Sequence, residues 1–71
     1  MDKESELFYK GIMVGSTTQA ITKILKRNIK ERESYIARYK RADDQGAKRA
    51  ADEIDSVIGL YEAEIARRNQ L

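Results

Sequence analysis

The chain of 71 residues contains no cysteine, no histidine, no proline and no tryptophan. Without cysteine it cannot form a disulfide, and without cysteine or histidine it lacks the usual ligands of structural zinc sites. A chain of this length buries only about 60% of the surface of its unfolded form, so we expect one small domain. Because the usual supports of a small domain are missing, the sequence predicts that copies associate into a homo-oligomer.

Long apolar runs are also missing. No stretch approaches the roughly 18 consecutive apolar residues that a membrane-spanning helix needs, and the acidic start MDKESE does not suit a signal peptide. We therefore expect no membrane partner and a cytoplasmic location, in the host cell if a phage encodes the chain. The absence of cysteine fits a reducing cytoplasm.

Groups that catalyse reactions are scarce as well. Histidine and cysteine nucleophiles or bases are absent, and the chain has no glycine-rich phosphate loop of the Walker type. Asp43 and Asp44 are adjacent acids, but at a helix break they are better explained as capping residues than as a catalytic pair. We expect a protein that is not an enzyme and needs no cofactor.

The residues that are abundant favour helix almost throughout. The main break is the segment Asp43, Asp44, Gln45 and Gly46, where the acids can cap the next helix and Gly46 can adopt a positive φ. We predict an all-α fold, with a short N-terminal helix followed by a long antiparallel αα-hairpin. All of it forms a single domain, 1–71, with helices over about 2–13, 17–42 and 46–70.

Apolar residues recur at helical spacing on both predicted arms of the hairpin. The first arm has Ile21, Leu25, Ile29, Ile36 and Tyr39, and the second has Ala47, Ala51, Ile54, Ile58, Tyr61 and Ile65. Arg32 interrupts the first stripe, and we expect it to reach Asp55 or Glu62 across the hairpin. Four apolar residues lie outside these stripes: Ile24, Tyr35, Val57 and Leu60. The N-terminal helix could bury some of them, and we expect contacts between protomers to cover the rest.

Charge is distributed unevenly between the two arms. Residues 22–49 carry ten Lys or Arg against four acids, whereas residues 50–71 carry two against five. The first arm therefore offers a positive face to an anionic partner. A nucleic-acid duplex suits it poorly, because helix-turn-helix spacing is lacking and Glu31, Glu33 and the acidic second arm would repel the phosphates.

The segment FYKGIMVGSTTQAITK, residues 8–23, combines features of an anion site. A hydroxyl at its centre can cap the next helix, whose first N–H groups and dipole favour a negative charge. Two lysines follow, and two aromatic rings before it could stack on a nucleobase. The predicted ligand-binding residues are Phe8, Tyr9, Ser16, Thr17, Thr18, Lys23 and Lys26. An alternative stays open, in which Phe8, Ile12, Met13 and Val14 dock the N-terminal helix on the hairpin and the hydroxyls only cap.

The string YEAEIARRN at residues 61–69, with the Asp-rich turn before it and the aromatic N-terminus, resembles the hairpin of small phage anti-CBASS proteins. Those proteins sequester cyclic nucleotide signals. The resemblance implies compact helical subunits, assembled as oligomers, that hold the ligand between neighbouring chains. It also implies that Tyr9 stacks on the ligand and Lys26 binds its phosphates, with Thr17 or Thr18 assisting.

Together these observations predict a non-catalytic, oligomeric protein that sequesters a small anionic ligand, such as a cyclic di- or oligonucleotide, between its subunits. The alternative is a helical interaction module of the phage-inhibitor type. In that case the apolar edge formed by Ile24, Tyr35, Val57 and Leu60 would dock on a host protein.

Overall fold

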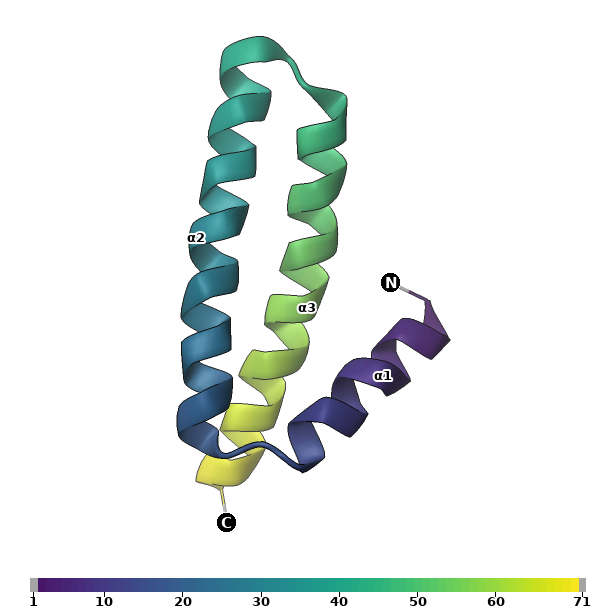
Figure 1. The fold of residues 1–71 in the computed structure, drawn as a ribbon, viewed down its shortest axis with the longest axis vertical. Coiled ribbons are helices and arrows are strands. Elements are labelled where there is room, and N and C mark those ends of the chain that lie inside the picture. Colours follow the sequence, from purple (N-terminus) through teal and green to yellow (C-terminus); the bar gives the residue numbers. More distant parts are fainter. Residues whose placement is uncertain (1, 71) are drawn as a thin grey trace.

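The computed structural model describes residues 2–70 and contains three α-helices there, with no strand in that range. Helix α1 spans Lys3–Val14, α2 spans Thr18–Ala42 and α3 spans Gln45–Asn69. The two long helices lie side by side and antiparallel, and α1 is set at an angle against the end of the hairpin where the chain terminates (Figure 1). The all-helical prediction is confirmed.

Each helix begins with a side chain that caps its first turn. The side chains of Asp2, Thr17 and Asp44 accept hydrogen bonds from the backbone N–H groups three residues later, at 2.8, 3.1 and 3.1 Å. These are the short polar residues that favour the position before a helix, because their oxygens satisfy N–H groups that have no partner inside the helix. Local sequence therefore fixes where all three helices start.

The turn between α2 and α3 differs from the expectation. The left-handed residue is Asp43, with φ 51° and ψ 41°, whereas Gly46 lies inside α3 and has no positive φ. The prediction that Gly46 supplies the positive φ is wrong. Aspartate is one of the few residues with a side chain that visit this region, and Asp43 is held there by a 3.1 Å hydrogen bond from Gln45 Nε2.

The core lies where the three helices meet. Met13 from α1, Ile21 from α2 and Tyr61 from α3 form one buried cluster, in which Ile21 has no exposed surface. The stripe predicted on α3 is buried at four positions: Ala47, Ala51, Ile58 and Tyr61. On α2 the stripe is less well covered, because Ile36 keeps 36% of its surface exposed near the hairpin turn.

The apolar edge predicted on the hairpin, formed by Ile24, Tyr35, Val57 and Leu60, is partly covered by α1. Ile24, Val57 and Leu60 pack against the buried cluster, and Tyr35 is half-buried beneath the guanidinium of Arg38. Apart from Ile36, the large apolar side chains that stay exposed among residues 2–70 are on α1: Leu7, Phe8, Ile12 and Val14. The prediction for Arg32 is confirmed for one of its two partners, since its Nη1 lies 2.5 Å from Asp55 Oδ1.

Candidate functional site

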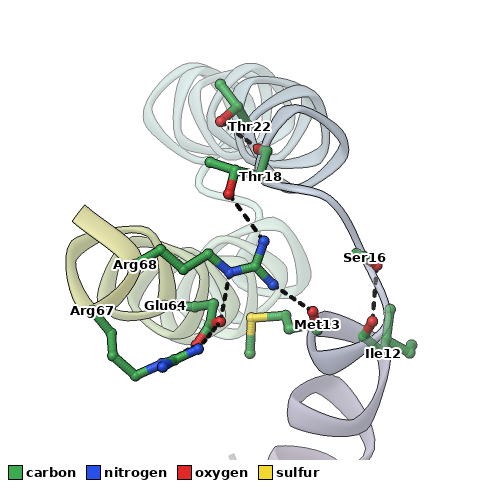
Figure 2. A network of polar contacts seen from close by, with 8 residues as sticks. All are labelled: Ile12, Met13, Ser16, Thr18, Thr22, Glu64, Arg67 and Arg68. Atoms are coloured by element: carbon green, nitrogen blue, oxygen red, sulfur yellow. Dashed lines mark hydrogen bonds and ion pairs between the residues drawn. The ribbon is translucent and has the colours of Figure 1, made fainter. Parts of the chain in front are cut away.

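The predicted site falls at the joint between α1 and α2, and an arginine from the end of α3 holds this joint together (Figure 2). Arg68 donates from Nη2 to the backbone oxygen of Met13 at 2.8 Å, and from Nη1 to Thr18 Oγ1 at 3.0 Å. Its Nε donates to Glu64 Oε2 at 2.8 Å. We call this set of residues the Arg68 clamp: Met13, Thr18, Glu64 and Arg68. It joins the end of α1 and the start of α2 to the last turns of α3.

Glu64 carries the negative charge of the clamp. Hydrogen bonds from Arg67 and Arg68, together with their positive charges, hold the pKa of the Glu64 carboxyl at about 2. Arg67 binds it through two parallel bonds of 2.9 Å. Glu64 is therefore ionised at neutral pH, and its negative charge is compensated by the two arginines that bind it.

The three consecutive hydroxyls of the predicted site all have structural partners. Ser16 Oγ donates to the backbone oxygen of Ile12 at 2.8 Å, Thr17 caps α2 through Ala20, and Thr18 accepts from Arg68. This arrangement explains the run of hydroxyls without a ligand. A ligand that used them would have to share or replace these hydrogen bonds.

The two aromatic residues of the predicted site lie in different surroundings. Tyr9 is half-buried and meets Tyr61 edge to face, with ring centroids 6.3 Å apart. Phe8 is 65% exposed, and its ring stands at 77° to that of Tyr9. Burial, and then the neighbouring Tyr9, raise the pKa of the Tyr61 hydroxyl.

The docking alternative for this segment is correct for one residue and wrong for three. Met13 is buried against the hairpin, whereas Phe8, Ile12 and Val14 face outward. The reason is that α1 packs through the face that carries Tyr9 and Met13, four residues apart and on one side of a helix. The opposite side of α1 therefore remains open.

Lys23 and Lys26 are exposed on α2 and point away from the core. At about 100° per residue they lie roughly 160° and 140° around the helix from Ile21, the buried residue of α2. Arg27 and Lys30 are exposed on the same side, and we call these four cations, Lys23, Lys26, Arg27 and Lys30, the basic row. No ion pair within residues 2–70 involves any of them.

One chain therefore brings only part of the predicted site together. Ser16, Thr17 and Thr18 lie together at the joint between α1 and α2. Tyr9 faces α3, whereas Lys26 lies on the side of α2 that faces away from the core. The Tyr9 ring and Lys26, the lysine predicted to bind phosphate, cannot enclose one ligand within a single subunit. Such a pocket needs residues from two chains.

The structure also has two grooves that were not predicted from the sequence. One, of about 350 Å³, lies between α1 and α3 and is mainly apolar, with Met13, Val14, Leu60 and Ala63 in its wall and Lys10, Glu64 and Arg67 around it. The other, of about 480 Å³, lies between α2 and α3 near the turn. There Tyr39 lies beside Arg32, Lys40 and Lys48 but also beside three acids, so the positive charge is largely balanced.

Two classes of site receive no support from the described residues. Among residues 2–70 no three Asp, Glu, His or Cys side chains gather in a way that could hold a metal ion. In the same range, none of the helices has both the length and the hydropathy of a membrane span.

Comparison with protein-family models, with curated proteins and with solved structures finds no match to this chain. The resemblance to the anti-CBASS proteins therefore stays a prediction that rests on the residues quoted for it.

Proposed function

We propose that this chain is a non-catalytic, homo-oligomeric binding protein that holds a small anionic ligand, such as a cyclic di- or oligonucleotide, between its subunits. The observation that carries the proposal is the basic row: Lys23, Lys26, Arg27 and Lys30. These cations lie within two turns of one helix, and no acid within residues 2–70 neutralises them through an ion pair. A compact anion with two phosphates would gain contacts with several of them at once.

The start of α2 supports the same class of ligand. The Thr17 side chain satisfies the N–H of Ala20, and the Thr17 carbonyl satisfies the N–H of Ile21. The N–H groups of the two preceding helical residues have no acceptor inside the helix, as at the start of any helix. Together with the helix dipole they add positive potential one turn before Lys23.

A boundary between subunits could bring together an aromatic ring and the basic row, which lie apart in one chain. Phe8 offers an exposed ring on α1, but the ring and the basic row belong to different sides of the molecule. When chains associate, the ring of one can lie beside the cations of another, and a nucleobase could then stack while its phosphate is paired. We expect such a ligand trap to act in the cytoplasm, in the host cell if the chain comes from a phage.

Calorimetry and thermal melting with a panel of cyclic nucleotides test the proposal. A ligand at about 100 times its dissociation constant should stabilise the protein by roughly 2.7 kcal/mol and raise the melting temperature. Lys26→Ala should weaken binding, whereas Lys40→Ala, which removes the same charge near the other end of α2, should not. The absence of heat and of any melting shift with every ligand in the panel would overturn the proposal.

A second candidate function is docking on another protein, and the outer side of α1 favours it. Leu7 and Phe8 are 61% and 65% exposed, and Val14 is 84% exposed. Purification from a native lysate separates the two candidates. A stoichiometric protein partner would favour docking, whereas a retained nucleotide would favour the ligand trap.

A further inference from the structure

The basic row is one part of a longer charged surface on α2. Counted at about 100° per residue from the buried Ile21, six basic side chains fall within an arc of about 120° on the side that faces away from the core. All six are exposed, and no ion pair within residues 2–70 involves any of them. We call this surface the basic ridge, and its members are Lys23, Lys26, Arg27, Lys30, Arg38 and Arg41.

The acids of the chain lie outside the basic ridge. Glu31 and Glu33 are the acids of α2, and they fall about 280° and 120° around the helix from Ile21, at the two margins of the arc. Without the ridge, the chain has eight basic residues against twelve acids. The excess of positive charge is therefore concentrated on one side of one helix.

The acids of α3 are separated from the ridge by the body of α2. Helix α3 packs on the side of α2 that carries Ile21, which is opposite to the ridge. A helix with its side chains is about 10 Å across, and physiological salt screens exposed charges over roughly 8 Å. These acids would repel a duplex that touched both arms, but they oppose an anion on the ridge only weakly.

The ridge is long and narrow. At about 1.5 Å per residue, Lys23 and Arg41 lie about 27 Å apart along α2. A nucleic-acid strand with about 3.4 Å per phosphate would place about eight phosphates over this length. Between Lys30 and Arg38 the exposed residues at the centre of the arc, Ser34 and Ala37, are small, so a strand can stay close to the helix.

Arg38 is held in place at the far part of the ridge. Its guanidinium carbon lies 5.5 Å from the centre of the Tyr35 ring, and Tyr35 is half-buried. A guanidinium stacked on a ring keeps its N–H groups available at the edge and has less freedom to lose when it binds a phosphate. Arg38 therefore links the basic row to Arg41 through an ordered cation.

We propose that the ligand of the basic row is a single-stranded oligonucleotide, whose phosphates follow the basic ridge from Lys23 to Arg41. One line of cations matches one phosphate chain, whereas a duplex presents two. The ridge has no large apolar side chain that could enter a lipid layer, which argues against a membrane surface as its partner. This inference rests on the proposed function and names the class of its ligand.

Fluorescence anisotropy tests the ridge with labelled oligothymidylates of two and ten nucleotides and with a labelled cyclic dinucleotide. The ten-nucleotide strand should bind at least about tenfold more tightly than the two-nucleotide strand, because only the longer one reaches all six cations. On logarithmic axes its affinity should fall with salt at a slope of about −4, as expected for six neutralised phosphates. The four cations of the basic row alone would give a slope of about −3.

Arg41→Ala and Arg49→Ala form a matched pair of variants. Both arginines are exposed near the turn, and neither forms an ion pair within residues 2–70. Arg49 lies on α3, about 200° around the helix from the buried Ala47, and is not part of the ridge. Arg41→Ala should weaken binding of the ten-nucleotide strand several-fold and make the salt slope shallower by about 0.7, with no effect on the cyclic dinucleotide. Arg49→Ala should change none of these values.

The outcomes separate this inference from the proposed function. If the cyclic dinucleotide binds but the two strands bind equally, or the two variants act equally, the ridge is overturned and the proposed ligand trap remains. Tighter binding of a ten-base-pair duplex, or of vesicles that contain phosphatidylserine, would also overturn the single-stranded ligand. If none of the probes binds, this inference and the proposed function fail together.

Discussion

The two ends of the hairpin are built differently. At the end near α1, large side chains form the buried cluster: Met13, Ile21 and Tyr61. Near the turn, the buried residues are only Ala47 and Ala51, while Ile36 stays partly exposed. The difference shows that the main cluster of large buried side chains lies where α1 packs on the hairpin, whereas small side chains fill the seam near the turn.

Toward the hairpin turn, where only small side chains are buried, polar contacts join α2 and α3. Arg32 pairs with Asp55 across the hairpin, and the Lys48 ammonium lies 5.7 Å from the centre of the Tyr39 ring. Both contacts are open to solvent, so each contributes little compared with a buried large residue. We expect stability to be concentrated at the end where α1 packs.

Two isoleucine substitutions on α2 test this difference most strongly. Ile21→Ala should cost about 3 kcal/mol of unfolding free energy, because it leaves a cavity at a fully buried position. Ile36→Ala removes the same atoms near the turn and should cost about 1 kcal/mol or less. Urea denaturation followed by circular dichroism measures both losses. Equal losses would show that the two ends of the hairpin contribute equally to the unfolding free energy.

Removing the Arg68 clamp should lower the unfolding free energy by less than Ile21→Ala does, at the same end of the hairpin. Arg68→Ala removes three hydrogen bonds from a charged group and should cost about 2 kcal/mol. Arg67→Ala is the control, because Arg67 also binds Glu64 but has no bond to α1 or α2 among the described residues. Hydrogen exchange should show faster exchange of α1 amides in Arg68→Ala only. Similar exchange in both variants would mean that the clamp does not hold α1.

Acid should weaken the clamp through Glu64. The pKa of its carboxyl falls from an ordinary 4.5 to about 2 in the folded chain, so the folded state favours the ionised form. The resulting stability is present above the unfolded pKa and is lost as pH falls from about 4.5 to about 2. Thermal melts across this range should show a shallower decline in Glu64→Gln than in Glu62→Gln. Parallel declines would remove Glu64 as the cause.

Much of the architecture followed from local sequence. The all-α class came from helix-favouring composition, and the start of α3 followed from the capping acid Asp44. The buried stripe of α3 followed from its spacing. These features depend on residues close together in the chain, where propensity and periodicity are informative.

Features that depend on distant residues were harder to predict. The sequence could not show which side of α1 faces the hairpin, because Phe8, Ile12 and Val14 are as apolar as Met13. Nor could it show that Arg68 would reach Thr18 and Met13, since one arginine at the end of a charged helix gives no signal of its partners. At the turn, Gly46 was the obvious residue for a positive φ, yet Asp43 adopts it with help from Gln45.

The bond from Arg68 to Met13 spans 55 positions of the chain. A ribosome makes α1 before α3, so the side chain that binds the last turn of α1 is made 55 positions after Met13. Before that point the contact between Arg68 and Met13 cannot form. In the nascent chain, α1 can pack on the part of α3 already made only through Tyr9 and Met13. The attachment of α1 to the hairpin through Arg68 therefore waits until the last turns of α3 have been made.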